Sequence, residues 1–416
     1  MSWIVHLIVL ALVCIVTGKD CVIDNRSRQN TWEAQLQKDI ITFNDIEAPN
    51  SNETEVYVKF ILKYFSFDAK EEIFKVHSWM MLAWTDERLK WDKTKYDGIT
   101  ETIALSNTIW SPGLRLVNEV DWDEFEPYYG QCTIQNMGFV FCIPRMVHGV
   151  LCNTKLINWP FDIQKCTLKF GASTKYCKVK FTFSSRRAVA MMGAEYGADW
   201  TIIDYEQAEY ENQDTQLSLT FYLERQAVGL AAIVIMPIIL LSMLTLSALL
   251  LEVKDYVRLG IISFSLLWHF YYLSSINDYI PKHSVDTPSI LLYARGSVLV
   301  TLIVLTLTTF LSCLMNRKSV PPNWVVSIND LVLKSRGKFI VIPRWEADLK
   351  GIAISDDLQR KVIEHWTDFA NIINSVFCIS LIMFYIICIS LYMPRPSLST
   401  NYVNLTDSDA FFMDQF

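Results

Sequence analysis

Residues 227–251 read AVGLAAIVIMPIILLSMLTLSALLL, and none of these side chains carries a charge. An apolar helix of about 20 residues is long enough to cross a bilayer. Further apolar stretches of this kind occupy residues 259–280, 289–314 and 371–393. Because lipid offers the backbone no hydrogen-bond partners, helices are the form expected of all four stretches. The sequence therefore predicts a four-helix transmembrane bundle, with three spans in quick succession and one set apart.

The distribution of basic residues predicts which side of the membrane each segment occupies. Lys and Arg are concentrated between the third and fourth spans, and such a bias marks the cytoplasmic side. The apolar segment 3–16 is shorter than a span and is followed by small residues, which is typical of a cleaved signal peptide. The predicted segments are a signal peptide at 1–20, an extracellular domain at 21–225, three membrane helices within 226–314, a short cytoplasmic segment at 315–369, the fourth helix at 370–393 and an extracellular tail at 394–416.

Three N-glycosylation sequons agree with this orientation, at Asn25, Asn52 and Asn404. Each falls in a segment that the topology places outside the cell, where glycans are added. We therefore expect a glycoprotein of the plasma membrane.

Short strand-like runs dominate the 200 residues before the first span. They alternate β-branched or aromatic residues with polar ones and are separated by turn residues, which favours an extracellular β-sandwich, with a helix at about 30–42. Cys132 and Cys142 lie equidistant from Met137, so a hairpin turning there would bring them face to face and favours a disulfide between them. Among the spans, Cys313, Cys378 and Cys388 are expected to be packing residues.

Composition and motifs argue against several classes of function. The 416 residues are 51% hydrophobic and 19% charged, which is too apolar for an ordinary soluble protein. No basic cluster with interleaved aromatic residues is present, which argues against nucleic acid, and no C-x-x-C pair suggests zinc. The G-x-S-x-G, H-E-x-x-H and phosphate-loop patterns are absent, so we expect neither an enzyme nor a cofactor.

Cys152 and Cys166 enclose thirteen residues, NTKLINWPFDIQK, with Trp-Pro-Phe-Asp at the centre. This stretch resembles the signature loop of the Cys-loop (pentameric) ligand-gated ion channels, and the resemblance implies a disulfide between the two cysteines. By spacing alone, the loop could equally be a structural staple, worth about 3 kcal/mol on the chain-entropy model. Cys21 and Cys177 then remain as a candidate pair.

Several further motifs extend the resemblance over residues 30–393. Residues 79–91, WMMLAWTDERLKW, resemble the W-x-x-x-x-W-x-D-x-x-L-x-W strand of nicotinic acetylcholine receptor subunits, and Arg225 stands twelve residues before Pro237, as in that family's first membrane helix. The order of the motifs matches the family throughout. The resemblance implies a pentamer around a central pore that binds its transmitter between neighbouring outer domains.

The positions that form the transmitter site in the family differ in this chain. A quaternary ammonium is held by a cage of aromatic rings, yet Gly113, Val117 and Ser173 stand where the principal face of the family has an acidic residue, a tyrosine and a tryptophan. Tyr205 and Tyr210 do not align cleanly with the tyrosines of the family's binding-site lid. Trp79 does match the tryptophan of the complementary face, and it should lie on the sheet face opposite Trp84. The resemblance therefore implies a divergent, non-alpha subunit.

The second span aligns with the family's pore helix. Residues at intervals of three and four would face the axis: Gly260, Phe264, Leu267, Tyr271, Ser274, Ser275 and Asp278. Leu267 falls on the leucine of the hydrophobic gate. At the cytoplasmic mouth, Val257 replaces the glutamate of cation-selective members, although Glu252 and Asp255 lie nearby. Membership of the nicotinic branch, rather than the mouth itself, favours cations.

Five residues are expected to couple the outer domain to the spans: Asp68, Glu71, Phe161, Asp162 and Arg225. Arg225 could pair with an acidic residue in the strand turn at 68–71 or could be a plain interfacial anchor. His269 should point away from the pore axis and be packed.

The sequence thus predicts a subunit of a nicotinic-like, cation-conducting channel that joins alpha-type subunits in a heteropentamer. Its expected partners are acetylcholine, those subunits and membrane lipid, at a postsynaptic plasma membrane. A non-conducting surface binding or assembly subunit, or a channel gated by another ligand, remains the alternative. A transporter is disfavoured, because no broken or charged helix marks a site at mid-membrane.

Overall fold

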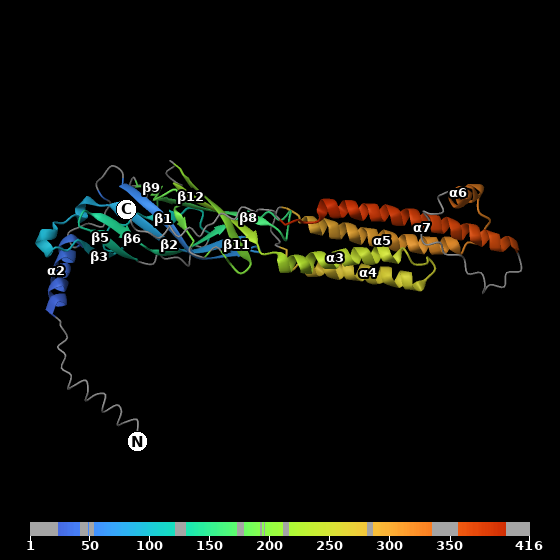
Figure 1. The fold of residues 1–416 in the computed structure, drawn as a ribbon, viewed down its shortest axis with the longest axis horizontal. Helices are drawn as coiled ribbons and strands as arrows, with labels where there is room; N and C mark the ends of the chain where they lie inside the picture. The colour runs from blue at the N-terminus through green and yellow to red at the C-terminus, as the bar shows by residue number, and fades with distance from the viewer. Residues whose placement is uncertain are drawn as a thin grey trace, which may run out of the picture.

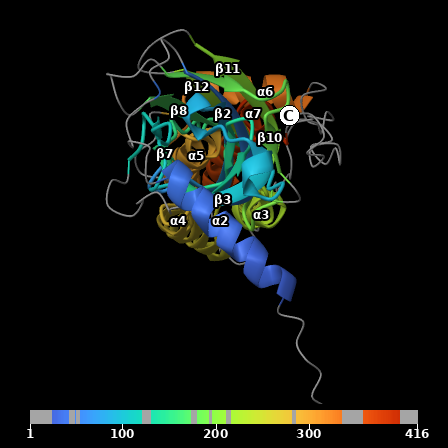
Figure 2. The ribbon, with the colours of Figure 1, turned by 90° about the vertical axis from the view of Figure 1, so that its left-hand side faces the viewer.

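The computed structural model is an elongated molecule with a β-rich outer domain at one end and a helical bundle at the other (Figure 1). It describes residues 24–41, 49, 54–120, 130–172, 179–191, 194, 196–210, 216–280, 286–334 and 357–396. Helix α2 (Asp24–Ile41) lies across the far end of the outer domain, as the view down the long axis shows (Figure 2). The predicted helix is therefore present and begins about six residues earlier than expected.

Two sheets form the predicted sandwich. The larger sheet is built on the long hairpin of β1 (Thr54–Asp68) and β2 (Ile73–Thr85), with strand order β10-β1-β2-β6-β5-β3; β9 also pairs with β1 and β7 with β2. The smaller sheet has the order β11-β12-β8-β4. The remaining strands are β3 (Glu101–Leu105), β4 (Leu114–Leu116), β5 (Gln131–Gln135), β6 (Phe139–Cys142), β7 (Arg145–Leu151), β8 (Ile163–Ala172), β9 (Val179–Phe183), β10 (Val189–Ala190), β11 (Trp200–Glu209) and β12 (Leu217–Arg225).

Alternating burial explains why these segments are strands. Along β1 and β2 the inward side chains, such as Phe60, Leu62, Phe74 and Trp84, are almost completely buried. The outward side chains are polar or half-exposed, which is the two-residue period of a sheet with one face on the core. Trp84, Trp91 and Trp200 are buried, and Trp110 packs against the same core.

Among the residues that the structure describes, four helices are long and apolar enough to cross a membrane: α3 (Val228–Ala248), α4 (Tyr256–Ile276), α5 (Ser289–Met315) and α7 (Asp357–Tyr392). They run side by side along the long axis (Figure 1). Helix α4 packs between α3 and α5, and α7 packs mainly against α5. The predicted four-helix bundle is therefore present.

Helix α7 begins well before the apolar stretch at 371–393 that predicted it. The apolar stretch alone gave no sign of the extra turns, because they are amphipathic. Helix α6 (Asn323–Lys334) packs beside them: Asn329 Nδ2 donates to the carbonyl of His365 at 2.8 Å, and Trp366 Nε1 donates to the carbonyl of Ser319 at 2.8 Å. The segment after α5 is thus partly helical and docked on α7.

Some predictions concern residues that the structure does not describe. They include the signal peptide, Cys21, Cys177, Ser173, Asn52 and Asn404. Asn25 lies in α2, but its side chain is outside the described set. The expectation for Cys313 is wrong: it is exposed on α5, whereas Cys378 is buried and Cys388 is half-buried. A helix that packs on both neighbours still leaves one stripe facing outward, and Cys313 lies on that stripe.

Candidate functional site at the junction of the outer domain and the helices

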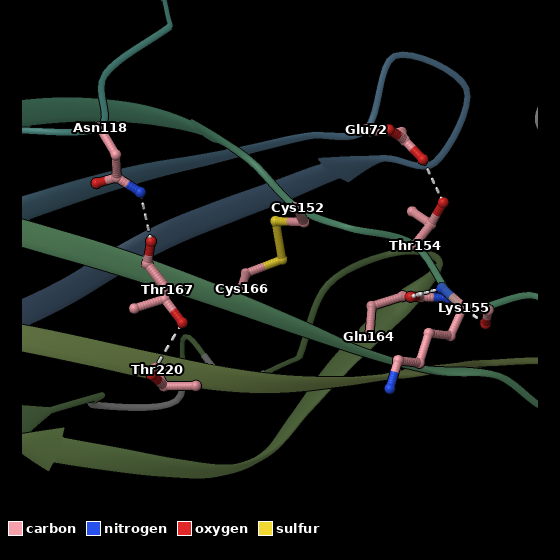
Figure 3. Close-up of a disulfide and its surroundings, with 9 residues drawn as sticks. All are labelled: Glu72, Asn118, Cys152, Thr154, Lys155, Gln164, Cys166, Thr167 and Thr220. Atoms are coloured by element: carbon pink, nitrogen blue, oxygen red, sulfur yellow. Dashed lines mark hydrogen bonds between the residues drawn. A yellow bond between two sulfur atoms is a disulfide. The ribbon is translucent and has the colours of Figure 1, made fainter. Parts of the chain in front are cut away.

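A disulfide-closed loop forms the end of the outer domain that faces the helices. Cys152 and Cys166 are bonded, with their Cα atoms 5.0 Å apart, and both are buried. Figure 3 shows this disulfide between Cys152, directly after β7, and Cys166 in β8. Gln164 closes the loop further by pairing with both backbone groups of Lys155, at 2.9 and 3.1 Å. Cys132 and Cys142 form the second predicted disulfide across the β5–β6 hairpin.

The loop inserts two apolar side chains among the helices. Leu156 and Trp159 have no exposed surface, and they belong to the same hydrophobic cluster as Val234 of α3 and Ile290 of α5. The backbone makes the same connection, since the N–H of Ser289, at the start of α5, donates to the carbonyl of Ile157 at 3.0 Å. The outer domain and the bundle therefore share one packed core at this point.

The same loop also holds the end of α7. Asn158 Nδ2 donates to the carbonyl of Arg395 at 2.8 Å, and the N–H of Arg395 donates to Asn158 Oδ1 at 3.1 Å. The two residues are 237 positions apart in sequence. The loop thus contacts both the beginning of α5 and the end of α7.

An ion pair joins the loop to the strand that leads into α3. Arg225 Nε lies 2.7 Å from Asp162 Oδ1, and Nη2 lies 3.1 Å from Oδ2. The side chain of Asp162 is 1% exposed and that of Arg225 is 12% exposed, and the Arg225 guanidinium lies 4.2 Å from the centre of the Trp200 ring. This two-pronged geometry is the strong form of an arginine–carboxylate contact.

The partner of Arg225 corrects one expectation. The sequence suggested an acidic residue in the turn at 68–71 or no partner at all, whereas the observed partner is the loop tip itself. Gln164 Nε2 donates to the second oxygen of Asp162 at 2.6 Å, so the buried carboxylate is fully engaged. Asp162 and Arg225, both predicted as coupling residues, therefore act on each other.

The turn between β1 and β2 contacts the base of the loop. Glu72 accepts a hydrogen bond from the hydroxyl of Thr154, and its carbonyl accepts the N–H of Cys152 at 2.8 Å (Figure 3). Glu72 has a φ of 59°, an uncommon backbone conformation for a residue with a side chain. The predicted coupling residue Asp68 caps this turn by accepting the N–H groups of Lys70 and Glu71.

A hollow of about 800 Å³ separates this turn from the helices. Asp68 and Glu71 line it from above, Arg225 and Trp200 from the side, and Tyr279, beyond the end of α4, from below. Phe161, the remaining predicted coupling residue, is half-buried beside Asp162. The junction therefore combines a tightly bonded side, at the loop, with an open side, at the turn.

Helix α4 presents two different stripes. Its buried stripe packs against the other helices: Arg258, Ile262, Ser265, His269, Tyr272 and Ile276. The predicted pore residues occupy the other side, where Phe264, Leu267 and Tyr271 are 54%, 68% and 64% exposed. Gly260, Ser274 and Asp278 are also exposed, and Ser275 is half-buried. In a bilayer such an exposed apolar stripe can face lipid, a neighbouring subunit or a pore axis.

In the first turn of α4, the positive charge of Arg258 points into the helical bundle. Arg258 is fully buried, and its guanidinium donates to Thr308 at 3.0 and 3.2 Å, to Asn374 at 2.8 Å and to the carbonyl of Leu251 at 3.2 Å. Asp255 stays exposed and caps the helix by accepting the N–H of Val257 at 2.9 Å. The neighbouring Lys254 is exposed too.

His269 is packed at the centre of the bundle, as expected. Its Nδ1 lies 2.7 Å from the carbonyl of Ser265, so this nitrogen carries the proton, and Nε2 accepts from Ser297 at 2.8 Å. Ser297 also contacts the hydroxyls of Tyr385 and Ser242. These side chains join all four spans through buried hydroxyl groups, which satisfies polar groups that lipid could not.

The positions matched to the family's transmitter site show few of its features. Gly113 and Val117 are exposed, Tyr210 is 50% exposed and Tyr205 is half-buried against the core. Trp79 is half-buried on the outward face of β2, opposite the buried Trp84 side, as its position in the strand predicted.

Sequence reasoning missed Asn158, Arg395 and the contact between Thr154 and Glu72. An Asn in a loop and an Arg after an apolar helix are each common at surfaces, and only the fold brings them together. A Glu at a positive φ likewise leaves no pattern in the sequence.

Comparisons with known proteins match this architecture. The family described as the neurotransmitter-gated ion-channel ligand binding domain matches residues 33–227. A beta-type acetylcholine receptor subunit of Caenorhabditis elegans is 22% identical over 75% of this chain and 65% of its own length. The neuronal acetylcholine receptor beta-2 subunit of Carassius auratus is 28% identical over 59% of this chain and 55% of its own length.

An alpha-type relative aligns as well. The neuronal acetylcholine receptor alpha-2 subunit of Gallus gallus is 25% identical over 83% of this chain and 67% of its own length. The matched region thus spans about two thirds or less of these relatives. Residues 33–227 thus match the neurotransmitter-gated ion-channel ligand binding domain, and the chain as a whole is similar to nicotinic acetylcholine receptor subunits, in keeping with its sandwich, its disulfide-closed loop and its four candidate spans.

Proposed function

We propose that this chain is a non-alpha subunit of a cation-conducting, heteropentameric channel in the plasma membrane. Acetylcholine is the expected transmitter, bound at interfaces that alpha-type partner subunits provide, and the expected setting is postsynaptic. In this proposal residues 1–20 are removed as a signal peptide, residues 21–225 and 394–416 lie outside, and residues 315–369 lie in the cytoplasm.

The observation that carries the proposal is the bonded junction. The loop at 152–166 packs Leu156 and Trp159 into the helical core and pairs Asp162 with Arg225, three residues before α3 begins. A displacement of the outer domain is therefore transmitted to the start of α3 and, through Ser289, to the start of α5. Tilting of α4, which packs between them, would then open the pore, a two-state change of rigid elements.

The exposed stripe of α4 supports a pore-lining role. Phe264, Leu267 and Tyr271 would form successive apolar rings, and such rings can stop ions by excluding water. Asp278 at the outer end and Asp255 at the inner end would supply acidic rings, while the charge of Arg258 is withdrawn into the bundle. This arrangement favours cations in spite of Val257 at the mouth.

The residues at the principal face support a non-alpha role. Val117 and Ser173 stand where the family has a tyrosine and a tryptophan, so the face lacks two of the aromatic side chains that hold a quaternary ammonium. The face cannot form a conventional acetylcholine cage by itself, so the chain needs a partner to respond to this transmitter.

Recording currents from cells that express this chain alone and with an alpha-type subunit tests the proposal. We expect acetylcholine-evoked current only in the co-expressing cells, with a reversal potential that follows the cation gradient when the salt gradient is reversed. Current that follows the chloride gradient would refute the cation assignment. Surface assembly that leaves the partner's current unchanged would favour the alternative, a non-conducting assembly subunit, which the altered principal face also allows.

A further inference from the structure

Two cationic side chains of the same chain lie against the ring of Trp79. The Lys63 ammonium lies 4.0 Å from the centre of the indole ring, and the Arg145 guanidinium carbon lies 5.4 Å from it. A cation within about 6 Å of a ring centre is attracted by the electrons of the ring face. The indole that could receive a ligand cation is therefore already engaged inside the subunit.

The strand pairing explains how both cations reach the ring. Arg145 of β7 is the direct partner of Trp79 in the sheet. On the other side Trp79 pairs with Ile61, and the register of β1 then shifts between Leu62 and Tyr64. Lys63 is the extra residue at this irregularity, and such bulges commonly re-aim a side chain. The contact is thus built into the backbone of β1.

The face around Trp79 is mainly basic. Strands β2 and β7 contain no acidic residue, and the outward side of β1 and β2 carries Lys59, Lys75 and the exposed His77 as well. The acidic residues of β1, Glu55 and Asp68, lie near its two ends, and Glu55 pairs with Lys180. A second cation brought to Trp79 would meet like charge at close range in a partly dry site, which is unfavourable. An anionic group would meet two donors already held in place.

We infer that Lys63 and Arg145 determine the ligand class at the Trp79 face: they close it to quaternary ammonium compounds and fit it to a ligand that carries an anionic group such as a carboxylate. The inference rests on the proposed function and on the match of Trp79 to the tryptophan of the family's complementary face, which faces the neighbouring subunit. If this inference holds, acetylcholine binds at interfaces of the pentamer that do not contain Trp79 of this chain.

The test uses purified receptors that contain this chain and an alpha-type subunit, with radiolabelled acetylcholine and radiolabelled succinate as probes. In the double variant Lys63→Gln/Arg145→Gln, we expect the half-saturating acetylcholine concentration at the interface of this chain to fall on the order of tenfold. Succinate, which we expect to bind the unaltered receptor, should bind the double variant at least tenfold more weakly.

Two further variants keep the result interpretable. Lys59→Gln removes the same charge from the same strand away from the ring, and it should change neither probe. Adding Trp79→Ala to the double variant should abolish the gain in acetylcholine affinity. All four side chains are at the surface, and counting receptors at the cell surface corrects for differences in assembly.

Either of two outcomes overturns the inference. One is unchanged acetylcholine binding in the double variant, and the other is a gain that survives Trp79→Ala. Absence of succinate binding to the unaltered receptor would overturn the anionic ligand class. If the receptors assemble but carry no current, the proposed channel function fails, while the binding measurements still decide this inference separately.

Discussion

Two regions of the outer domain differ in how their matched residues are held. Beside the helices, Asp162 and Trp159 are buried, Arg225 is 12% exposed, and both carboxylate oxygens of Asp162 are engaged. Among the positions matched to the transmitter site, Val117 is exposed, and Trp79, at the middle of β2, is covered by the chain's own cations. The contrast fits the proposed function, in which the junction with the helices is built to transmit motion and the acetylcholine site depends on a partner subunit.

Breaking the buried ion pair should have the largest effect. Asp162→Asn leaves the Arg225 charge inside the junction without its partner, and removing one member of a buried pair costs about 3–5 kcal/mol. We expect the thermal unfolding temperature of the purified chain to fall and acetylcholine-evoked current to be lost.

Glu206→Gln is the matched control. Glu206 and Lys165 form an exposed pair at 3.9 Å, and such pairs contribute little. Equal unfolding temperatures for the two variants would contradict the view that the loop tip is a stabilised junction.

His148 tests the packed core of the outer domain. It is buried between Phe60 and Phe170, and burial lowers its pKa from 6.5 to about 4. The neutral ring therefore stabilises the fold fully above pH 6.5, and this contribution is lost as the pH falls from 6.5 to about 4. The loss amounts to about 3 kcal/mol once the pH is below both values.

His148→Phe should remove this acid sensitivity, since phenylalanine cannot bind a proton. Unfolding temperatures at pH 7.5 and 4.5 measure the difference. The exposed His77, on the neighbouring strand, supplies the control His77→Asn, which should keep the sensitivity of the unaltered chain. If both variants lose the acid sensitivity equally, the sensitivity does not come from His148.

Leu267→Ser tests whether the exposed stripe of α4 lines the pore. A polar ring at the gate is more easily wetted, so we expect channels to open at an acetylcholine concentration lower by about tenfold, roughly 1.4 kcal/mol. Ile262→Val, on the buried stripe of the same helix, is the control and should leave the concentration dependence almost unchanged. Unaltered gating in a conducting Leu267→Ser receptor would refute the pore alignment.

Val117→Tyr should have the smallest effect. It restores one aromatic side chain of the principal face, but an ammonium cage needs several rings, and Gly113 remains beside it. We expect the half-maximal acetylcholine concentration to change by less than about threefold. A larger gain would mean that this face is closer to a working site than its sequence suggests.

Local patterns in the sequence predicted most of the architecture. Hydrophobic length revealed the four spans, alternation revealed the β1–β2 hairpin, and spacing around Met137 placed the Cys132–Cys142 bond. These features depend on neighbours in sequence, which is why they could be recognised without a structure.

The contacts that the sequence did not reveal are long-range. The pairing of Asn158 with Arg395 spans 237 positions, and the partner of Arg225 depends on how the loop folds against β12. The contact of Lys63 with Trp79 depends on a bulge for which β1 carries no glycine or proline signal. Side chains that act across elements can be assigned only once the packing is known.

The most direct test of the account is chemical access to α4 in the assembled receptor. Leu267→Cys receptors containing an alpha-type partner would be treated with a charged, water-soluble thiol reagent in the presence and absence of acetylcholine. The account predicts irreversible block of the current that develops when acetylcholine is present, because an open pore exposes this position to water. Undiminished current after treatment, with the buried-stripe variant Ile262→Cys behaving identically, would contradict it.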